Sequence, residues 1–222
     1  MDPRRYFDSL YPLQDEVLRV IGGLETDFYL TGGTAASRGY LNHRFSDDLD
    51  FFVNDDRRFV LWADRLIQGL SSVWQVQVGL REERFVRLSI LGKAEQLKIE
   101  LVNDVPSRVG SIVVHPVLGR LDSAENILAN KLTALFDRQE PKDMADVWGF
   151  CTRLGLPITK ALEGAQGKAA GIFPVDLARI LLGATRSDWD LVRWIEAPEP
   201  ERFLADLRSL GEQLLLLKPP RS

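Results

Sequence analysis

The sequence predicts an α+β protein, in which a mixed sheet with flanking helices is followed by an all-helical C-terminal half. Two observations predict this fold. Strand-like apolar segments alternate with helical ones up to about residue 120, and apolar residues at helical spacing dominate from residue 123 onward. We therefore expect two domains, covering residues 1–120 and 121–222.

The first half is expected to alternate helices and strands. Apolar residues at helical spacing predict a helix over residues 6–21, which Gly22 and Gly23 end. A short helix over residues 34–41 and a longer one over residues 59–70 are also predicted. The predicted strands cover residues 27–31, 49–53, 73–80, 85–91, 97–102 and 111–115.

The second half is expected to contain helices alone. Asp122 or Ser123 is placed to cap a helix that runs through Leu135. Further helices are predicted near residues 142–154, 174–183 and 199–217, and the last residues, 218–222, are expected to fray.

Composition excludes several classes of protein. The chain has 222 residues, 45% hydrophobic and 27% charged, which is typical of an ordinary globular protein with a buried core. Its formal net charge of −4 gives no support for nucleic-acid binding. We expect a cytoplasmic protein without membrane contact, for three reasons. The sequence has a single cysteine, its N-terminus does not resemble a signal peptide, and it has no apolar run of membrane length.

A Gly-Gly-Thr turn is the first feature that indicates chemistry. Gly32 and Gly33 separate a predicted strand from a short helix, and Thr34 stands near the helix N-cap. Free backbone N–H groups at such a turn bind anions, and glycine lets the backbone approach a phosphate closely. Taken alone, these residues also fit an ordinary strand–helix turn.

Paired carboxylates follow at the next predicted strand. Asp48 and Asp50 should share one face of that strand, because residues i and i+2 of a strand point the same way. A divalent cation relieves the repulsion between such charges, and Mg²⁺ favours carboxylates together with substrate phosphates. Taken alone, the pair also fits a solvated strand entrance. In the strand predicted over residues 97–102, Glu100 would face away from the core and offers a third carboxylate, although acids are also common on exposed strand faces. These three acids are the candidate ligands of Mg²⁺ or Mn²⁺.

The order of these features is more specific than any one of them. A glycine turn, one short helix and an Asp-x-Asp pair resemble the nucleotidyltransferase superfamily that includes DNA polymerase beta. Two metal ions held by three carboxylates activate an attacking oxygen and neutralise the leaving pyrophosphate. The resemblance implies a nucleotidyltransferase-like sheet in the first half.

The helical half narrows the resemblance. Residues 32–35 read GGTA, residues 44–50 read RFSDDLD, residues 131–132 read KL, and residues 138–147 read RQEPKDMADV. These four ordered motifs resemble the AbiEii/AbiGii family of nucleotidyltransferases, the toxins of type IV toxin–antitoxin and phage-abortive systems. Lys142 stands where the family often has arginine, which keeps the charge but loses the planar fork.

The resemblance implies a role for individual residues. Lys131 would contact the nucleotide phosphates, and Asp143 would orient Lys131 or a substrate group. The implied catalytic residues are Asp48, Asp50, Lys131 and Asp143. The implied nucleotide-binding residues are Gly32, Gly33, Thr34, Arg44, Ser46 and Lys131. The implied partners are an NTP substrate, a tRNA end as acceptor and a cognate antitoxin protein.

Two other functions stay open. The acceptor could be a small molecule, as in antibiotic nucleotidyltransferases, or the chain could be a non-catalytic nucleotide-binding module. The intact acids and Lys131 argue against the second of these.

Two histidines and one basic cluster offer further candidate sites. His43 and His115 lack a ligand set for zinc, and His43 is expected at the surface. The basic cluster consists of Arg81, Arg84, Arg87 and Lys93. It is either a basic patch for RNA built on a hairpin or a solvated strand face.

Overall fold

The computed structural model describes residues 2–217 and divides into two compact units. Unit 1 contains Met1–Gly39, Phe45–Pro106 and Ser111–Asp122. Unit 2 contains Tyr40–Arg44, Ser107–Gly110 and the chain from Ser123 onward. Two short segments of the N-terminal half thus belong to the helical unit. The predicted fraying of residues 218–222 lies outside the described residues.

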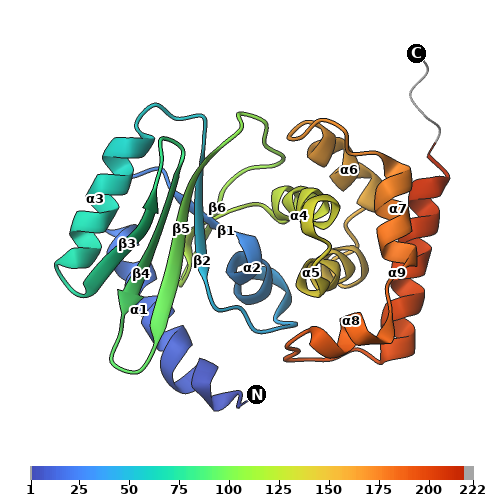
Figure 1. The fold of residues 1–222 in the computed structure, drawn as a ribbon, viewed down its shortest axis with the longest axis horizontal. Coiled ribbons are helices and arrows are strands. Elements are labelled where there is room, and N and C mark those ends of the chain that lie inside the picture. The colour runs from blue at the N-terminus through green and yellow to red at the C-terminus, as the bar shows by residue number, and fades with distance from the viewer. Residues whose placement is uncertain (1, 218–222) are drawn as a thin grey trace. The chain divides into compact units, whose positions relative to one another are not determined.

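Unit 1 is built on a seven-stranded sheet within the described chain, in the order β3-β4-β5-β2-β1-β7-β6 (Figure 1). The sheet is mixed, because β2 runs parallel to β5 and β1 runs parallel to β7, whereas the other pairs are antiparallel. The strands are β1 (Tyr29–Thr31), β2 (Leu49–Asn54), β3 (Gln75–Arg81), β4 (Phe85–Leu91), β5 (Gln96–Asp104), β6 (Val113–His115) and β7 (Gly119–Leu121).

The two faces of the sheet differ in polarity. Burial alternates along β2 and β5, so that apolar side chains such as Leu49 and Ile99 are fully buried. Helices α1 (Tyr11–Gly22) and α3 (Phe59–Ser71) lie on one side of the sheet in Figure 1 and bury their own apolar stripes. The opposite face of β2 and β5 is only half-buried and carries the acids discussed below.

Unit 2 is helical beyond Ser123. Its helices are α4 (Ala124–Arg138), α5 (Pro141–Thr152), α6 (Ile158–Gln166), α7 (Pro174–Leu182), α8 (Arg186–Leu191) and α9 (Pro200–Leu215). Helix α4 packs against α5 and α6, and α7 packs against α9. The Ser123 hydroxyl accepts a hydrogen bond from the backbone N–H of Asn126, which is the N-cap predicted from the sequence.

No helix in the described part of the chain has the length and apolar character needed to cross a bilayer.

Most predicted elements are confirmed, with shifted ends. The predicted first helix is a π-helical turn, η1 (Tyr6–Leu10), followed directly by α1. The short helix begins at Gly32 rather than Thr34, as α2 (Gly32–Thr34) continued by η2 (Ala35–Leu41). Strand β7 and helices α6 and α8 were not predicted. Strand β7 and helix α8 have only 3 and 6 residues, too few for a clear apolar period. Helix α6 is as long as α7, but two of its four buried residues are alanines.

The burial pattern of β5 predicts how much two truncations lower the free energy of unfolding. Replacing fully buried Ile99 with alanine should lower the free energy of unfolding by about 2–5 kcal/mol, because it leaves a cavity in the core. The same truncation at half-buried Val102, on the other face, should cost roughly 1 kcal/mol. Urea denaturation of both variants measures the difference, and a larger loss at Val102 would contradict the assigned face.

Candidate active site

The glycine turn lies directly against one of the predicted acids. Gly32 has a φ of +67°, and a Cβ added there would lie 2.1 Å from Asp50 Oδ2. Thr31, the residue before it, is the register partner of Asp50 on the neighbouring strand. Both the backbone conformation and the space above it therefore require glycine at position 32. The turn predicted for phosphate and the strand predicted for metal meet at this point.

Thr34 and Ser46 hold the backbone that leads into β2. The Thr34 hydroxyl donates a 2.5 Å hydrogen bond to the Asp48 carbonyl and lies 3.0 Å from the Ser46 hydroxyl. Both side chains are buried. In this structure they fix the main chain beside Asp48, and their predicted contacts with a nucleotide stay predictions.

The N-terminal helices also fix this segment. The Tyr6 hydroxyl donates to Asp47 Oδ1 at 2.7 Å. The Gln14 amide donates to the carbonyls of Ser46 and Asp47 at 3.3 and 3.0 Å. The approach to β2 is thus tied to η1 and α1, so Asp48 stands on a well-supported backbone.

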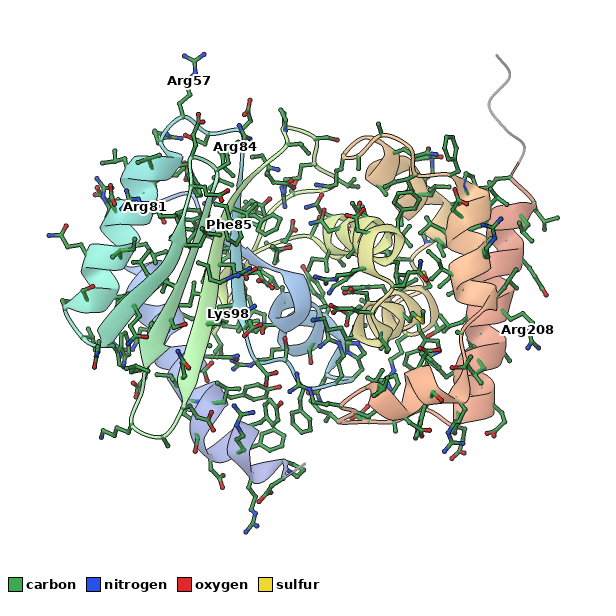
Figure 2. All side chains as sticks on the ribbon, in the orientation of Figure 1. Arg57, Arg81, Arg84, Phe85, Lys98 and Arg208 are labelled. Carbon is green, nitrogen blue, oxygen red and sulfur yellow. The ribbon has the colours of Figure 1, made fainter. Side chains whose placement is uncertain are left out.

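Three carboxylates gather on the half-buried face of the sheet with two cations. Asp50 and Glu100 are register partners on the parallel strands β2 and β5, and Asp48 precedes β2 by one residue. Lys98 Nζ lies 2.9 Å from Asp48 Oδ2 and 3.2 Å from Glu100 Oε1. Arg87 Nε donates to the same Glu100 oxygen at 2.8 Å. Figure 2 labels Lys98 on β5.

The chemistry of this group fits a divalent cation in part. Carboxylates from adjacent strands are the oxygen ligands that Mg²⁺ prefers. Among residues 2–217, however, no three acidic, histidine or cysteine side chains are close enough together to hold a metal ion. Lys98 contacts two of the acids instead, so a cation bound between Asp48 and Glu100 would have to replace its ammonium group.

Lys98 is held in its charged form. Its partial burial alone would lower the pKa, but the hydrogen bond to Asp48 and the charges of Asp48 and Glu100 raise it above its usual value. The ammonium group therefore acts as a counter-ion for these acids at neutral pH.

Unit 2 contains a second cluster, centred on Asp146 of α5. Arg44 binds its carboxylate with two nitrogens, Nε and Nη2, each at 2.7 Å. Lys131 Nζ lies 2.7 Å from Asp146 Oδ2 and 2.7 Å from Asp143 Oδ1. His43 Nε2 lies 2.9 Å from Asp146 Oδ1. Asp146 thus links residues near the start of unit 2 to α4.

The cluster is buried and strongly charged. The side chains of Asp143 and Asp146 are 0% exposed, and that of Lys131 is 7% exposed. Burial alone would raise the pKa of Asp146, but Arg44, Lys131 and His43 lower it well below its usual value. Burial likewise opposes the charge of Lys131, yet the two aspartates raise its pKa.

Some predictions about these residues need correction. His43 was expected at the surface, but it is fully buried. Its side chain contacts Asp146, and its carbonyl accepts a hydrogen bond from the backbone N–H of Ile195. Asp146 is bound by Arg44 and Lys131, whereas Arg138 donates to Asp143, with Nε at 2.9 Å from Oδ2. Arg44 is 3% exposed, and its predicted contact with a nucleotide stays a prediction.

The predicted contact between Lys131 and Asp143 is present, although their catalytic roles stay predictions. No local pattern predicts the contacts of Arg44 and His43 with Asp146, because more than 100 residues separate these partners.

The arginines of the predicted basic patch are each paired with an acid. Strands β3 and β4 form the expected hairpin, and Figure 2 shows Arg81 and Arg84 near its turn. Arg81 Nη2 lies 2.7 Å from Asp64 Oδ1, and Arg84 Nη1 lies 2.8 Å from Asp55 Oδ1. Arg87 pairs with Glu100, as described above. These pairs reduce the net positive charge of the surface.

Comparison with known proteins identifies the family. The family described as "Nucleotidyl transferase AbiEii toxin, Type IV TA system" matches residues 17–206. Because this match covers most of the sequence, the chain belongs to the AbiEii family. It is also 29% identical over 142 residues to the uncharacterized protein aq_aa25 of Aquifex aeolicus, and this alignment spans 64% of the chain and 65% of that protein.

Two solved structures share the fold. A crystal structure from Helicobacter pylori, described as a candidate nucleotidyltransferase, superposes with a TM-score of 0.64 over 91% of this chain and 93% of that one. The JHP933 protein of the same organism gives a TM-score of 0.64 over 93% and 92%. Both are 18% identical in sequence, so they support the fold alone.

The close approach of Gly32 to Asp50 predicts opposite effects for two alanine substitutions. Gly32→Ala should destabilise the protein by at least about 1–2 kcal/mol, because it places a side chain at positive φ and displaces the Asp50 carboxylate. Gly22→Ala, at a helix end with no atom within 4 Å of the new Cβ, should be neutral or stabilise by up to about 1 kcal/mol. Thermal and urea unfolding compare the two, and equal effects would refute the steric argument.

The Asp146 cluster predicts a pH-dependent stability. Asp146→Asn should lower the free energy of unfolding at pH 7 by roughly 3–5 kcal/mol, because it leaves buried cations without their partner. A carboxylate with a depressed pKa stabilises the fold above its unfolded pKa of about 3.9, and this contribution is lost as the pH falls towards its folded pKa.

The difference between the wild type and this variant should therefore shrink below about pH 4. Asp137→Asn, at an exposed position of α4, is the control and should change stability by less than about 0.5 kcal/mol. Urea unfolding at several pH values measures both variants, with circular dichroism to confirm that each folds. A difference that is constant down to pH 3 would contradict the assignment.

Proposed function

We propose that this member of the AbiEii family transfers a nucleoside monophosphate from an NTP to an acceptor and releases pyrophosphate. The observation that carries the proposal is the contact between the two predicted motifs. Gly32 approaches Asp50 so closely that a side chain at position 32 would collide with its carboxylate. The turn that we propose for phosphate and the strand that we propose for metal therefore meet at one place, which supports a phosphoryl-type transfer.

The residues of unit 1 would provide the metal and phosphate sites. Asp48, Asp50 and Glu100 are the proposed ligands of Mg²⁺ or Mn²⁺. Because no three acids of the described chain lie close enough to hold the ion by themselves, phosphate oxygens of the NTP would complete its ligand set. The ion would neutralise charge on the triphosphate and on the pyrophosphate that leaves. The backbone N–H groups of Gly32 and Gly33 would receive phosphate oxygens.

Within unit 2, Lys131 is the proposed phosphate ligand. Lys131 is held by Asp143 and Asp146, which use two of its three ammonium hydrogens. The remaining N–H would be available to a phosphate oxygen. Asp143 and Asp146 would act as positioning residues, since they bind Lys131 and hold it in a charged form.

For the acceptor we propose an RNA end, with tRNA as the leading candidate, and for the partner a cognate antitoxin. Membership of a type IV toxin–antitoxin family supports the antitoxin partner. The tRNA end is the acceptor that the resemblance of the motifs implies. One structural observation favours the alternative of a small-molecule acceptor. The arginines near the β3–β4 turn are paired with acids, and the chain has a net charge of −4, so the electrostatic attraction for RNA is weak.

Transfer should depend on the strand acids. Purified protein is incubated with each labelled NTP, Mg²⁺ or Mn²⁺, and either tRNA or a small-molecule extract. We expect label on tRNA with the wild type and none with Asp48→Asn or Asp50→Asn, both of which should remain folded. Asp8→Asn, at an exposed position of η1, is the control and should keep full activity.

The outcomes separate the candidate functions. Full activity of either strand variant would refute the metal assignment. Label only in the small-molecule fraction would replace the RNA acceptor. Nucleotide binding without transfer to any acceptor would favour the non-catalytic module.

A further inference from the structure

Lys98 has an unusual position among the acids of the candidate active site. It stands on β5 two residues before Glu100, so both side chains lie on the same face of the strand. Its Nζ lies within hydrogen-bond distance of Glu100 and of Asp48, which belongs to a different segment of the chain. One ammonium group therefore bridges two of the three carboxylates that are candidates for the metal.

The charges around Lys98 are nearly balanced. Glu100 Oε1 accepts hydrogen bonds from both Lys98 and Arg87, whereas the Asp48 carboxylate pairs with Lys98. Because like charges at this spacing repel, the acids need a cation nearby. In the described structure, the Lys98 ammonium group neutralises part of this negative charge.

The Lys98 ion pairs are of the kind that exchange readily. The Lys98 side chain is 39% exposed and that of Asp48 is 40% exposed. Partly exposed pairs of this kind contribute little to stability, so their loss costs the fold little. A lysine side chain has a flexible four-carbon stem, and rotation about its bonds can turn the ammonium group away from the acids.

From these contacts we infer that Lys98 is an exchangeable counter-ion, which holds Asp48 and Glu100 until a divalent cation arrives and then binds the triphosphate of the incoming nucleotide. This inference rests on the proposed function, because it uses the same metal site. Its physical basis is charge balance. A metal–nucleotide complex brings both a cation that replaces the ammonium group and an anion that attracts it.

The exchange has a measurable consequence beyond activity. A free divalent cation must displace Lys98 without offering it a new partner, whereas a metal–nucleotide complex supplies phosphate oxygens. Lys98 should therefore weaken the binding of metal alone and strengthen the coupling between metal and nucleotide. Because coupling between two ligands is reciprocal, it can be measured from the metal side alone.

The test compares Mn²⁺ binding with and without a non-hydrolysable NTP analogue, by calorimetry and by electron paramagnetic resonance. Lys98→Met, which keeps the stem but removes the charge, should bind Mn²⁺ alone about tenfold more tightly, because repulsion between the ammonium group and the ion is removed. The factor by which the analogue raises Mn²⁺ affinity should fall about tenfold in the same variant. Lys98→Arg keeps the charge and should resemble the wild type in both respects.

Two control variants complete the design. Lys93→Met removes an exposed lysine from the β4–β5 turn and should change neither quantity. Asp48→Asn should abolish Mn²⁺ binding in the wild-type and Lys98→Met backgrounds, which places the measured ion at this site.

Several outcomes would overturn the inference. Unchanged or weaker Mn²⁺ binding by Lys98→Met would show that Lys98 does not compete with the ion. Tighter Mn²⁺ binding with unchanged coupling would show that Lys98 does not move to the triphosphate. Failure of every variant to bind Mn²⁺ would remove both the inference and the metal assignment.

Failure of the inference is distinguishable from failure of the proposed function. If transfer requires Asp48 and Asp50 but Lys98→Met binds Mn²⁺ as the wild type does, the inference alone fails. If Lys98→Met shows the expected changes but no acceptor is labelled in the transfer experiment, the proposed function alone fails and the exchange stands.

Discussion

The close approach of Asp50 to Gly32 is the constraint on which the candidate site of unit 1 depends. Strand β2 has β1 on one side and β5 on the other, so its register with both neighbours is fixed. This register commits one face of β2 to the apolar core and leaves Asp50 on the other face. Any side chain at position 32 would occupy the volume of that carboxylate. The glycine is therefore required by the acid, whether or not it also binds a phosphate.

The sequence predicted the parts of the fold that follow from local pattern. The strands β2, β4 and β5 were predicted because their apolar residues alternate or continue over strand length, and α4 was predicted because Ser123 caps a clear apolar period. Strand β7 pairs with β1 through a single register pair, Leu30 with Leu121, and so depends on a distant partner. No local pattern predicts such a strand.

The same limit applies to the candidate site. The acids Asp48, Asp50 and Glu100 could be named from strand periodicity, because the side chains that share a face are set by a period of two. The burial of His43 could not be predicted this way, since its partner Asp146 lies on a helix more than 100 residues later. The contact of Glu100 with Arg87 could not be predicted either, because the pairing of β4 with β5 places Arg87 opposite it.

In each unit, one lysine lies between two carboxylates and reduces the repulsion between them. The two lysines differ in burial, and this gives them different properties. The Lys131 side chain is 7% exposed and lies between two fully buried aspartates. Breaking such a pair leaves a charge without compensation in a medium of low polarity, at a cost of roughly 3–5 kcal/mol. The Lys98 side chain is 39% exposed, and a surface pair is worth about 0–1 kcal/mol. Water can therefore solvate Lys98 and its acids while they change partners, whereas Lys131 remains fixed. The physical difference between a permanent cation and an exchangeable one thus lies in their access to solvent, since the chemical group is the same.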